Sequence, residues 1–149
     1  MKKNQLKHSL FLLICWSLLL VACGGGSILS TNSEVPIVVA DGEELDLLRD
    51  VDVQTVAAIK ERDDVFLLDV REQWEYDAGH LEDITHIPTG EVANRLSEIP
   101  TDKNVIVYCA SGVRSDQITN FLLQNGYSDV HDMQGGIIAW QRAGFPVVK

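Results

Sequence analysis

Val105-Ile106-Val107-Tyr108-Cys109-Ala110-Ser111-Gly112-Val113-Arg114-Ser115 is the stretch that decides the fold of this 149-residue chain. Its first four residues are β-branched or aromatic, as in a buried strand, and the residues after the cysteine favour a turn. Over residues 114–124, apolar side chains recur at helical spacing. The stretch therefore predicts a strand that turns tightly into a helix, with one thiol at the turn.

Strand-like and helix-like segments alternate from residue 51 onward. Further strands are expected at 65–70, 84–87 and around 130, and further helices at 53–62, 91–97 and 137–142. This alternation predicts a single α/β domain with a mainly parallel central sheet flanked by helices. Ligands of such sheets bind at the carboxyl ends of the strands, which is where Cys109 is expected.

The N-terminal segment has the pattern of a secretory signal. A basic segment at 1–7 precedes an apolar run at 10–22, which is shorter than the about 20 residues that span a membrane. The run ends in Leu20-Val21-Ala22-Cys23, which resembles the bacterial lipobox, whose cysteine is lipidated and begins the mature protein. We expect a signal peptide at 1–22, and a lipidated Cys23 with a tether at 23–50. An ordinary cleaved signal with an incidental cysteine is the alternative.

This reading implies an extracytoplasmic protein held at a bacterial membrane by lipid. Residues 34–50 either continue the tether or add an element to the domain, and the sequence leaves both open. The net charge of −10 would become −13 on cleavage, because residues 1–22 hold three lysines and no acidic residue. Such an acidic surface argues against a nucleic-acid partner, and it requires any anion site to be a local one.

Cys109 is a candidate nucleophile. Cys15 would leave with the signal and Cys23 would carry lipid, so Cys109 would remain as a free thiol without an intramolecular disulfide. A helix N-terminus offers unpaired backbone N–H groups that favour a thiolate, and Arg114 adds a positive charge nearby. The alternative is an inert structural thiol, since free cysteines are commonly buried.

Several motifs, taken together and in order, resemble those of the single-domain rhodanese family of sulfurtransferases. They are Asp69-Val70-Arg71-Glu72, Trp74-Glu75-Tyr76, Gly79-His80, Ile87-Pro88, the loop at 108–115, Gly126-Tyr127, Gly135-Gly136-Ile137 and Trp140. The resemblance implies a rhodanese domain at 51–149. One departure is Leu81-Glu82-Asp83-Ile84-Thr85-His86, where the family commonly has Ile-Pro-Gly-Ala; it adds two carboxylates near a turn and would affect donor or partner preference.

The resemblance implies transfer of a sulfane sulfur from a donor such as thiosulfate to a thiol or cyanide acceptor. The sulfur would travel as a persulfide on Cys109, with no cofactor and no metal. It also implies that Cys109 and Arg114 are catalytic, that Ala110, Ser111, Gly112, Val113 and Ser115 cradle the sulfur, and that Asp69, Arg71 and His80 support the loop. The other histidines, His86 and His131, are expected on the surface or at strand ends, and no metal-ligand spacing is present.

Two other functions use the same thiol. A persulfide carrier or thiol-sensing module without turnover would dock on a membrane partner. A cysteine phosphatase or arsenate reductase would bind a tetrahedral anion, but the related phosphatases place five residues between their cysteine and arginine. Only four residues separate Cys109 and Arg114, and the shorter loop fits a single sulfur better.

Overall fold

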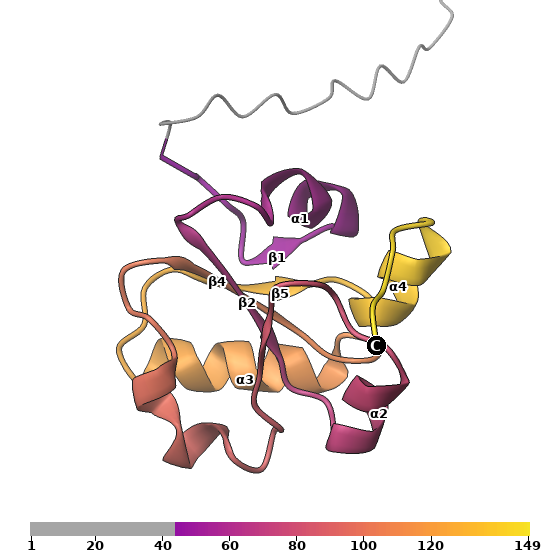
Figure 1. Ribbon diagram of the computed structural model, residues 1–149. Helices are drawn as coiled ribbons and strands as arrows, with labels where there is room; N and C mark the ends of the chain where they lie inside the picture. Colours follow the sequence, from indigo (N-terminus) through magenta and orange to yellow (C-terminus); the bar gives the residue numbers. More distant parts are fainter. Residues whose placement is uncertain (1–43) are drawn as a thin grey trace, which may run out of the picture. The chain divides into compact units, whose positions relative to one another are not determined.

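A five-stranded, all-parallel sheet lies at the centre of residues 44–149, the part of the chain that the computed structural model describes (Figure 1). The strand order is β1-β5-β4-β2-β3. The strands are β1 (Asp50–Val51), β2 (Val65–Asp69), β3 (Thr85–His86), β4 (Asn104–Tyr108) and β5 (Val130–Met133). The helices are α1 (Val53–Ile59), α2 (Gln73–Ala78), α3 (Val113–Gln124) and α4 (Gly136–Arg142). The predicted α/β class is confirmed.

The sheet is covered on both faces, and Figure 1 shows α1 and α3 on opposite sides of it. Side chains of β4 alternate between two apolar clusters, as the period of a strand requires. Ile106 and Tyr108 join a cluster with residues of α1 and α4, whereas Val105 and Val107 join a cluster with residues of α3. The same alternation places Cys109, the next residue in this series, on the α3 side.

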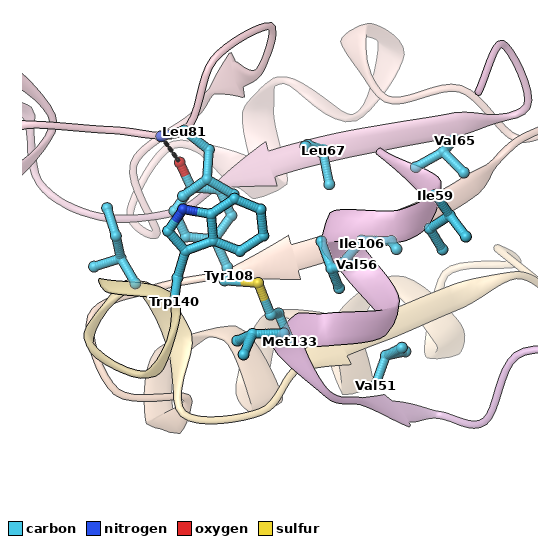
Figure 2. Packing of buried hydrophobic residues seen from close by; sticks show 12 residues of the cluster. Val51, Val56, Ile59, Val65, Leu67, Leu81, Ile106, Tyr108, Met133 and Trp140 are labelled. Atoms are coloured by element: carbon cyan, nitrogen blue, oxygen red, sulfur yellow. Dashed lines mark hydrogen bonds between the residues drawn. The ribbon is translucent and has the colours of Figure 1, made fainter. Parts of the chain in front are cut away.

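The cluster on the α1 side closes around two aromatic residues near the C-terminal ends of β2 and β4. Figure 2 shows the Trp140 ring beside Tyr108 and Leu81. The Leu81 N–H donates a hydrogen bond of 3.3 Å to the Tyr108 hydroxyl, and the Trp140 indole donates one of 2.8 Å to the Pro146 carbonyl. Both rings are fully buried, so both polar groups need these partners.

The chain between β3 and β4 does not form the single short helix expected at 91–97. Two 3-10 turns, Val92–Asn94 and Leu96–Glu98, occupy this stretch. Arg95 lies between them with φ −122° and ψ 22°, outside the helical range. Its guanidinium binds the carboxylates of Glu91, before the first turn, and Glu98, in the second. These contacts stabilise the interruption between the two 3-10 turns.

Two further differences concern α1 and the segment before it. The expected helix at 53–62 ends at Ile59, and the chain then turns into β2, with the Arg62 N–H bonded to the Ile59 carbonyl and the Val65 N–H bonded to the Arg62 carbonyl. Arg62 also binds Asp64 through two hydrogen bonds of 2.8 Å. In the segment before β1, Leu45 and Leu47 pack against the core. Residues 1–43, which contain the predicted signal, Cys23 and most of the predicted tether, lie outside the described residues. Among residues 44–149 no helix is long and apolar enough to cross a bilayer.

Candidate active site

Cys109 directly follows β4, where that strand lies between β5 and β2. The carboxyl ends of all three parallel strands therefore meet beside the thiol, as the sequence predicts. The residue is 1% exposed, so only a ligand that enters the turn can reach the sulfur. It is the one free cysteine of the described residues.

The loop after Cys109 curls around the sulfur. Gly112 has φ +98°, a left-handed conformation that glycine adopts without steric cost, and its N–H donates a hydrogen bond of 3.2 Å to Sγ. The Ser115 hydroxyl lies 3.5 Å from Sγ and also donates to the Gly112 carbonyl at 3.1 Å. Of the other expected cradle residues, Ser111 contributes its backbone N–H, whereas Ala110 turns its carbonyl toward α4 and Val113 is exposed.

These donors decide the protonation of the thiol. Burial alone raises the pKa of Cys109, because a charged sulfur loses solvation. The Ser115 hydroxyl and the backbone N–H groups of Ser115, Ser111 and Gly112 act in the opposite direction and outweigh burial, so the pKa lies below its ordinary value. The site therefore favours a thiolate, the nucleophilic form.

Arg114 is held by a residue that sequence reasoning did not assign to the site. Its two terminal nitrogens bind the two carboxylate oxygens of Glu75, each at 2.7 Å. This bidentate pair raises the pKa of Arg114 and lowers that of Glu75, and Arg114 also interacts with Cys109. Glu75 lies on α2, for which the sequence analysis gave only the Trp74-Glu75-Tyr76 motif. In the structure, Glu72 and Glu75 form a capping box at the start of this helix.

Asp69 and Arg71 form a buried ion pair beneath α2. The guanidinium of Arg71 lies 2.6 Å from an Asp69 carboxylate oxygen, and both residues are at most 4% exposed. Arg71 also donates to the carbonyls of Glu75 at 3.1 Å and Gly79 at 2.9 Å. This ion pair therefore fixes the helix that carries Glu75, and Glu75 in turn fixes Arg114.

His80 belongs to the packing of α2 and contacts Tyr76. Its ring stacks on Tyr76 with centroids 3.8 Å apart, and its backbone pairs with Val148. His86, in the segment that departs from the family pattern, also stacks on Tyr76 at 4.4 Å and places Nε2 2.8 Å from the Arg71 carbonyl. Both imidazoles thus support α2.

His131 differs from the expected surface or strand-end position. It is the second residue of β5, is 6% exposed and places Nδ1 2.8 Å from the Leu48 carbonyl. Its ring holds the segment before β1 against β5. Within residues 44–149 no group of three or more histidine, cysteine, aspartate or glutamate side chains is placed to hold a metal ion.

The first residues of α4 form hydrogen bonds to the backbone of the loop that carries Cys109. The N–H groups of Ile137 and Ile138 donate to the carbonyls of Cys109 and Ala110, at 2.9 and 3.1 Å. A Cβ atom on Gly136 would lie 2.3 Å from the Cys109 carbonyl oxygen, so only glycine allows this approach. The Gly135-Gly136 pair therefore sets the position of the loop backbone.

Asp132 is a second residue that sequence reasoning did not assign to the site. It lies on β5, is 6% exposed, and its carboxyl interacts with the Ser115 hydroxyl. Burial raises the pKa of Asp132, and Ser115 only partly offsets this effect. No local sequence pattern marks the residue, because its importance arises from the neighbouring strand and helix.

The loop that carries Cys109 thus lies at the carboxyl edge of a parallel sheet, with Arg114 beside the thiol and the Gly135-Gly136 pair against the loop backbone. The chain belongs to the rhodanese-like domain family, whose model matches residues 52–143.

Similar proteins agree with this assignment. A sulfurtransferase from Allochromatium vinosum is 38% identical over 103 residues, which cover 68% of this chain and 96% of the relative. A rhodanese-related protein from Thermoplasma volcanium, of known structure, is 32% identical with a TM-score of 0.62, over 68% of this chain and 98% of that one. The family and these relatives support a sulfurtransferase-type enzyme.

The same domain also occurs within larger proteins. A tRNA uridine(34) hydroxylase from Photorhabdus laumondii is 31% identical over 94 residues, which cover 56% of this chain but only 27% of the hydroxylase. Its activity therefore cannot be transferred from this domain alone.

Proposed function

We propose that the protein is a sulfurtransferase that carries a sulfane sulfur as a persulfide on Cys109. The observation that carries this proposal is the set of donors aimed at Sγ, with the Gly112 N–H at 3.2 Å and the Ser115 hydroxyl at 3.5 Å. They stabilise a thiolate in a buried turn. Thiosulfate is the proposed test donor, and cyanide or a thiol is the proposed acceptor.

In the first step the Cys109 thiolate attacks the outer sulfur of thiosulfate. A bond forms between Sγ and that sulfur, the sulfur–sulfur bond to sulfite breaks, and sulfite leaves with the electron pair. Arg114 supplies positive charge beside the incoming dianion in a protein that is otherwise acidic. The loop N–H groups then face the anionic persulfide.

In the second step the acceptor attacks the outer sulfur of the persulfide. The new bond forms between acceptor and sulfur, the bond to Sγ breaks, and the Cys109 thiolate is regenerated. The same donors that lower the pKa of Cys109 make this thiolate a good leaving group. Two half-reactions that share one covalent intermediate predict ping-pong kinetics.

Intact-mass spectrometry tests this function directly. The purified chain and its Cys109→Ala variant are incubated with thiosulfate, and then cyanide is added and thiocyanate is assayed. One added sulfur on the wild type alone, discharged over many cycles, is the expected result. Loading without turnover would indicate the persulfide carrier instead, and no loading would overturn the proposal. Cys23→Ser is the matched control for the other cysteine of the predicted mature chain.

We further propose that the domain is anchored to a bacterial membrane through a lipid on Cys23. The support is the Leu20-Val21-Ala22-Cys23 motif that follows an apolar run. Growth of an expressing bacterium with an alkyne-tagged fatty acid should label the wild type and not Cys23→Ser. Equal labelling of both would overturn the anchor and leave the enzymatic proposal untouched.

A further inference from the structure

A pocket of about 220 Å³ lies between α2 and α4, two helices that Figure 1 shows at the same end of the sheet. Trp74, Glu75 and Ala78 line it from α2. Ile137 and Gln141 line it from α4. Because both helices contact the residues around the thiol, the pocket can hold part of a molecule that reacts there.

Two of the lining residues make these contacts. The carboxylate of Glu75 binds the guanidinium of Arg114, which is on the first turn of α3. The N–H of Ile137 donates a hydrogen bond of 2.9 Å to the carbonyl of Cys109. The pocket is therefore one residue away from the nucleophile on the α4 side and from the arginine on the α2 side.

The charged residues that line the pocket, Arg71 and Glu75, are both paired within the described part of the chain. The Arg71 guanidinium lies 2.6 Å from a carboxylate oxygen of Asp69 and also donates to the Gly79 carbonyl. Both carboxylate oxygens of Glu75 bind Arg114. Since each charge is already matched inside the protein, the pocket suits an uncharged group better than an anion such as thiosulfate.

The apolar side chains near the pocket are exposed. The Trp74 side chain is 72% exposed, and covering such a ring removes a large apolar area from water. Val113, directly after Gly112, is 65% exposed, and Ile138, whose N–H binds the Ala110 carbonyl, is 47% exposed. Among residues 44–149, three of the five exposed large apolar side chains thus belong to the elements around the Cys109 loop. Such a concentration is typical of a binding surface.

We propose that this pocket binds the apolar body of an uncharged organic thiol, and that this thiol is the acceptor of the sulfur. Trp74 would determine the specificity, because an aromatic body can stack on its ring. A cavity of about 150 Å³ can hold one benzene molecule, so a pocket of about 220 Å³ accommodates one ring with a short linker to the sulfur.

This inference rests on the proposed function, since it names the class of acceptor used in the second half-reaction. The thiol sulfur bonds to the outer sulfur of the Cys109 persulfide, and the thiol proton passes to solvent. The bond to Sγ breaks, and its electron pair stays on Sγ as the regenerated thiolate. The acceptor leaves as an organic persulfide.

Binding is tested with 2-phenylethanol, the hydroxyl analogue of such a thiol, by following backbone amide signals of Gly79 and Gln141 of the complete chain in NMR spectra. Saturable shifts are expected, and ethanol, which lacks the ring, should cause none over the same concentrations. Trp74→Ala should weaken binding about tenfold, whereas Trp74→Phe, which keeps an aromatic ring, should retain most of it. No saturable binding of 2-phenylethanol would overturn the site.

The matched control is Leu123→Ala, which removes an exposed apolar side chain of α3 that does not line the pocket. This variant should bind 2-phenylethanol like the wild type. If Trp74→Ala binds as tightly as Leu123→Ala, the assignment of Trp74 is overturned.

A second measurement tests the role of the bound group in sulfur transfer. Protein loaded with sulfur from thiosulfate is discharged by 2-phenylethanethiol or by ethanethiol, and values of kcat/KM are compared per thiolate. We expect a preference of about tenfold for 2-phenylethanethiol, expressed mainly in KM, which Trp74→Ala removes and Trp74→Phe largely keeps. A merely structural role of Trp74 would change both rates alike and leave their ratio intact, and that result would overturn the proposal. Failure to load would count against the proposed function alone, since the alcohol measurement needs no persulfide.

Discussion

Arg114 and Glu75 are 39 residues apart in the chain, and their side chains are joined by two parallel hydrogen bonds of 2.7 Å. The pair links the loop of the nucleophile to α2, and the buried Asp69–Arg71 pair holds α2 in turn. The orientation of Arg114 thus depends on Glu75, and the position of Glu75 depends on the buried Asp69–Arg71 ion pair. Because a guanidinium fork is planar, this arrangement fixes its direction as well as its position.

Removal of the Arg114 guanidinium should impair the first half-reaction. Arg114→Ala is expected to lower kcat/KM for thiosulfate by about 100-fold or more, the loss seen when one preorganised donor is removed from an anion site. Steady-state assays with cyanide as acceptor measure it. Arg142→Ala, at the exposed end of α4, is the control and should stay near the wild type. A change of less than threefold in Arg114→Ala would remove the residue from the mechanism.

Glu75 should act through the arginine. Glu75→Gln keeps the charge of Arg114 but loses its bidentate partner, so we expect a smaller fall in kcat/KM, about tenfold. In Arg114→Ala the further change Glu75→Gln should have little effect on kcat/KM, because its partner is already absent. If the fold-losses in kcat/KM of the two single variants multiply in the double variant, the two residues act independently and this coupling is contradicted.

Loss of the Ser115 hydroxyl should make the thiol less acidic. Ser115→Ala removes a donor to Sγ, so the pKa of Cys109 should rise, and the alkylation rate by iodoacetamide should reach half its maximum at higher pH. Ser111→Ala is the matched control, since Ser111 acts on the sulfur through its backbone N–H, which the substitution keeps. An unchanged alkylation profile in Ser115→Ala would show that the hydroxyl does not stabilise the thiolate.

Two glycines with positive φ offer a matched comparison of strain and clash. Gly126 has φ +92° with open space around it, and Gly126→Ala should cost about 1 kcal/mol of unfolding free energy. Gly136 has φ +57°, but a Cβ there would meet the Cys109 carbonyl at 2.3 Å, so Gly136→Ala should cost more and also reduce sulfur loading. Urea unfolding of the two variants measures the difference in their unfolding free energies. Equal losses of stability would show that the loop backbone shifts to accommodate the added Cβ at residue 136.

Asp132 should lower stability at neutral pH. Its folded pKa is raised by burial, above the unfolded value of about 4, so folding is penalised once the unfolded carboxyl ionises. The penalty is absent below that value and grows as pH rises toward the folded pKa. Asp132→Asn should therefore gain unfolding free energy relative to wild type at pH 7.5, and less at pH 4. Urea unfolding at both pH values tests this, with Asp129→Asn as control, and a gain independent of pH would contradict it.

Much of the fold follows from local pattern. The continuous apolar run at 65–70 predicts a strand buried on both faces, and the β-branched run before Cys109 predicts a second strand. Both are present, as β2 and β4. The stretch at 91–97 was predicted wrongly as one helix, because its composition does not show that Arg95 binds carboxylates on both sides. α2 was missed, since six residues are too few for a clear helical period.

The sequence by itself determined the α/β class and the placing of Cys109 between a strand and a helix, because strand and helix periods are local properties of the chain. Only the tertiary structure decided what surrounds the thiol. Strand order brings β2 and β5 to either side of β4, so Glu75 reaches Arg114 from one side and Asp132 reaches Ser115 from the other. Such partners are distant in sequence, and no local pattern encodes their meeting, which depends on how the strands are ordered in the sheet.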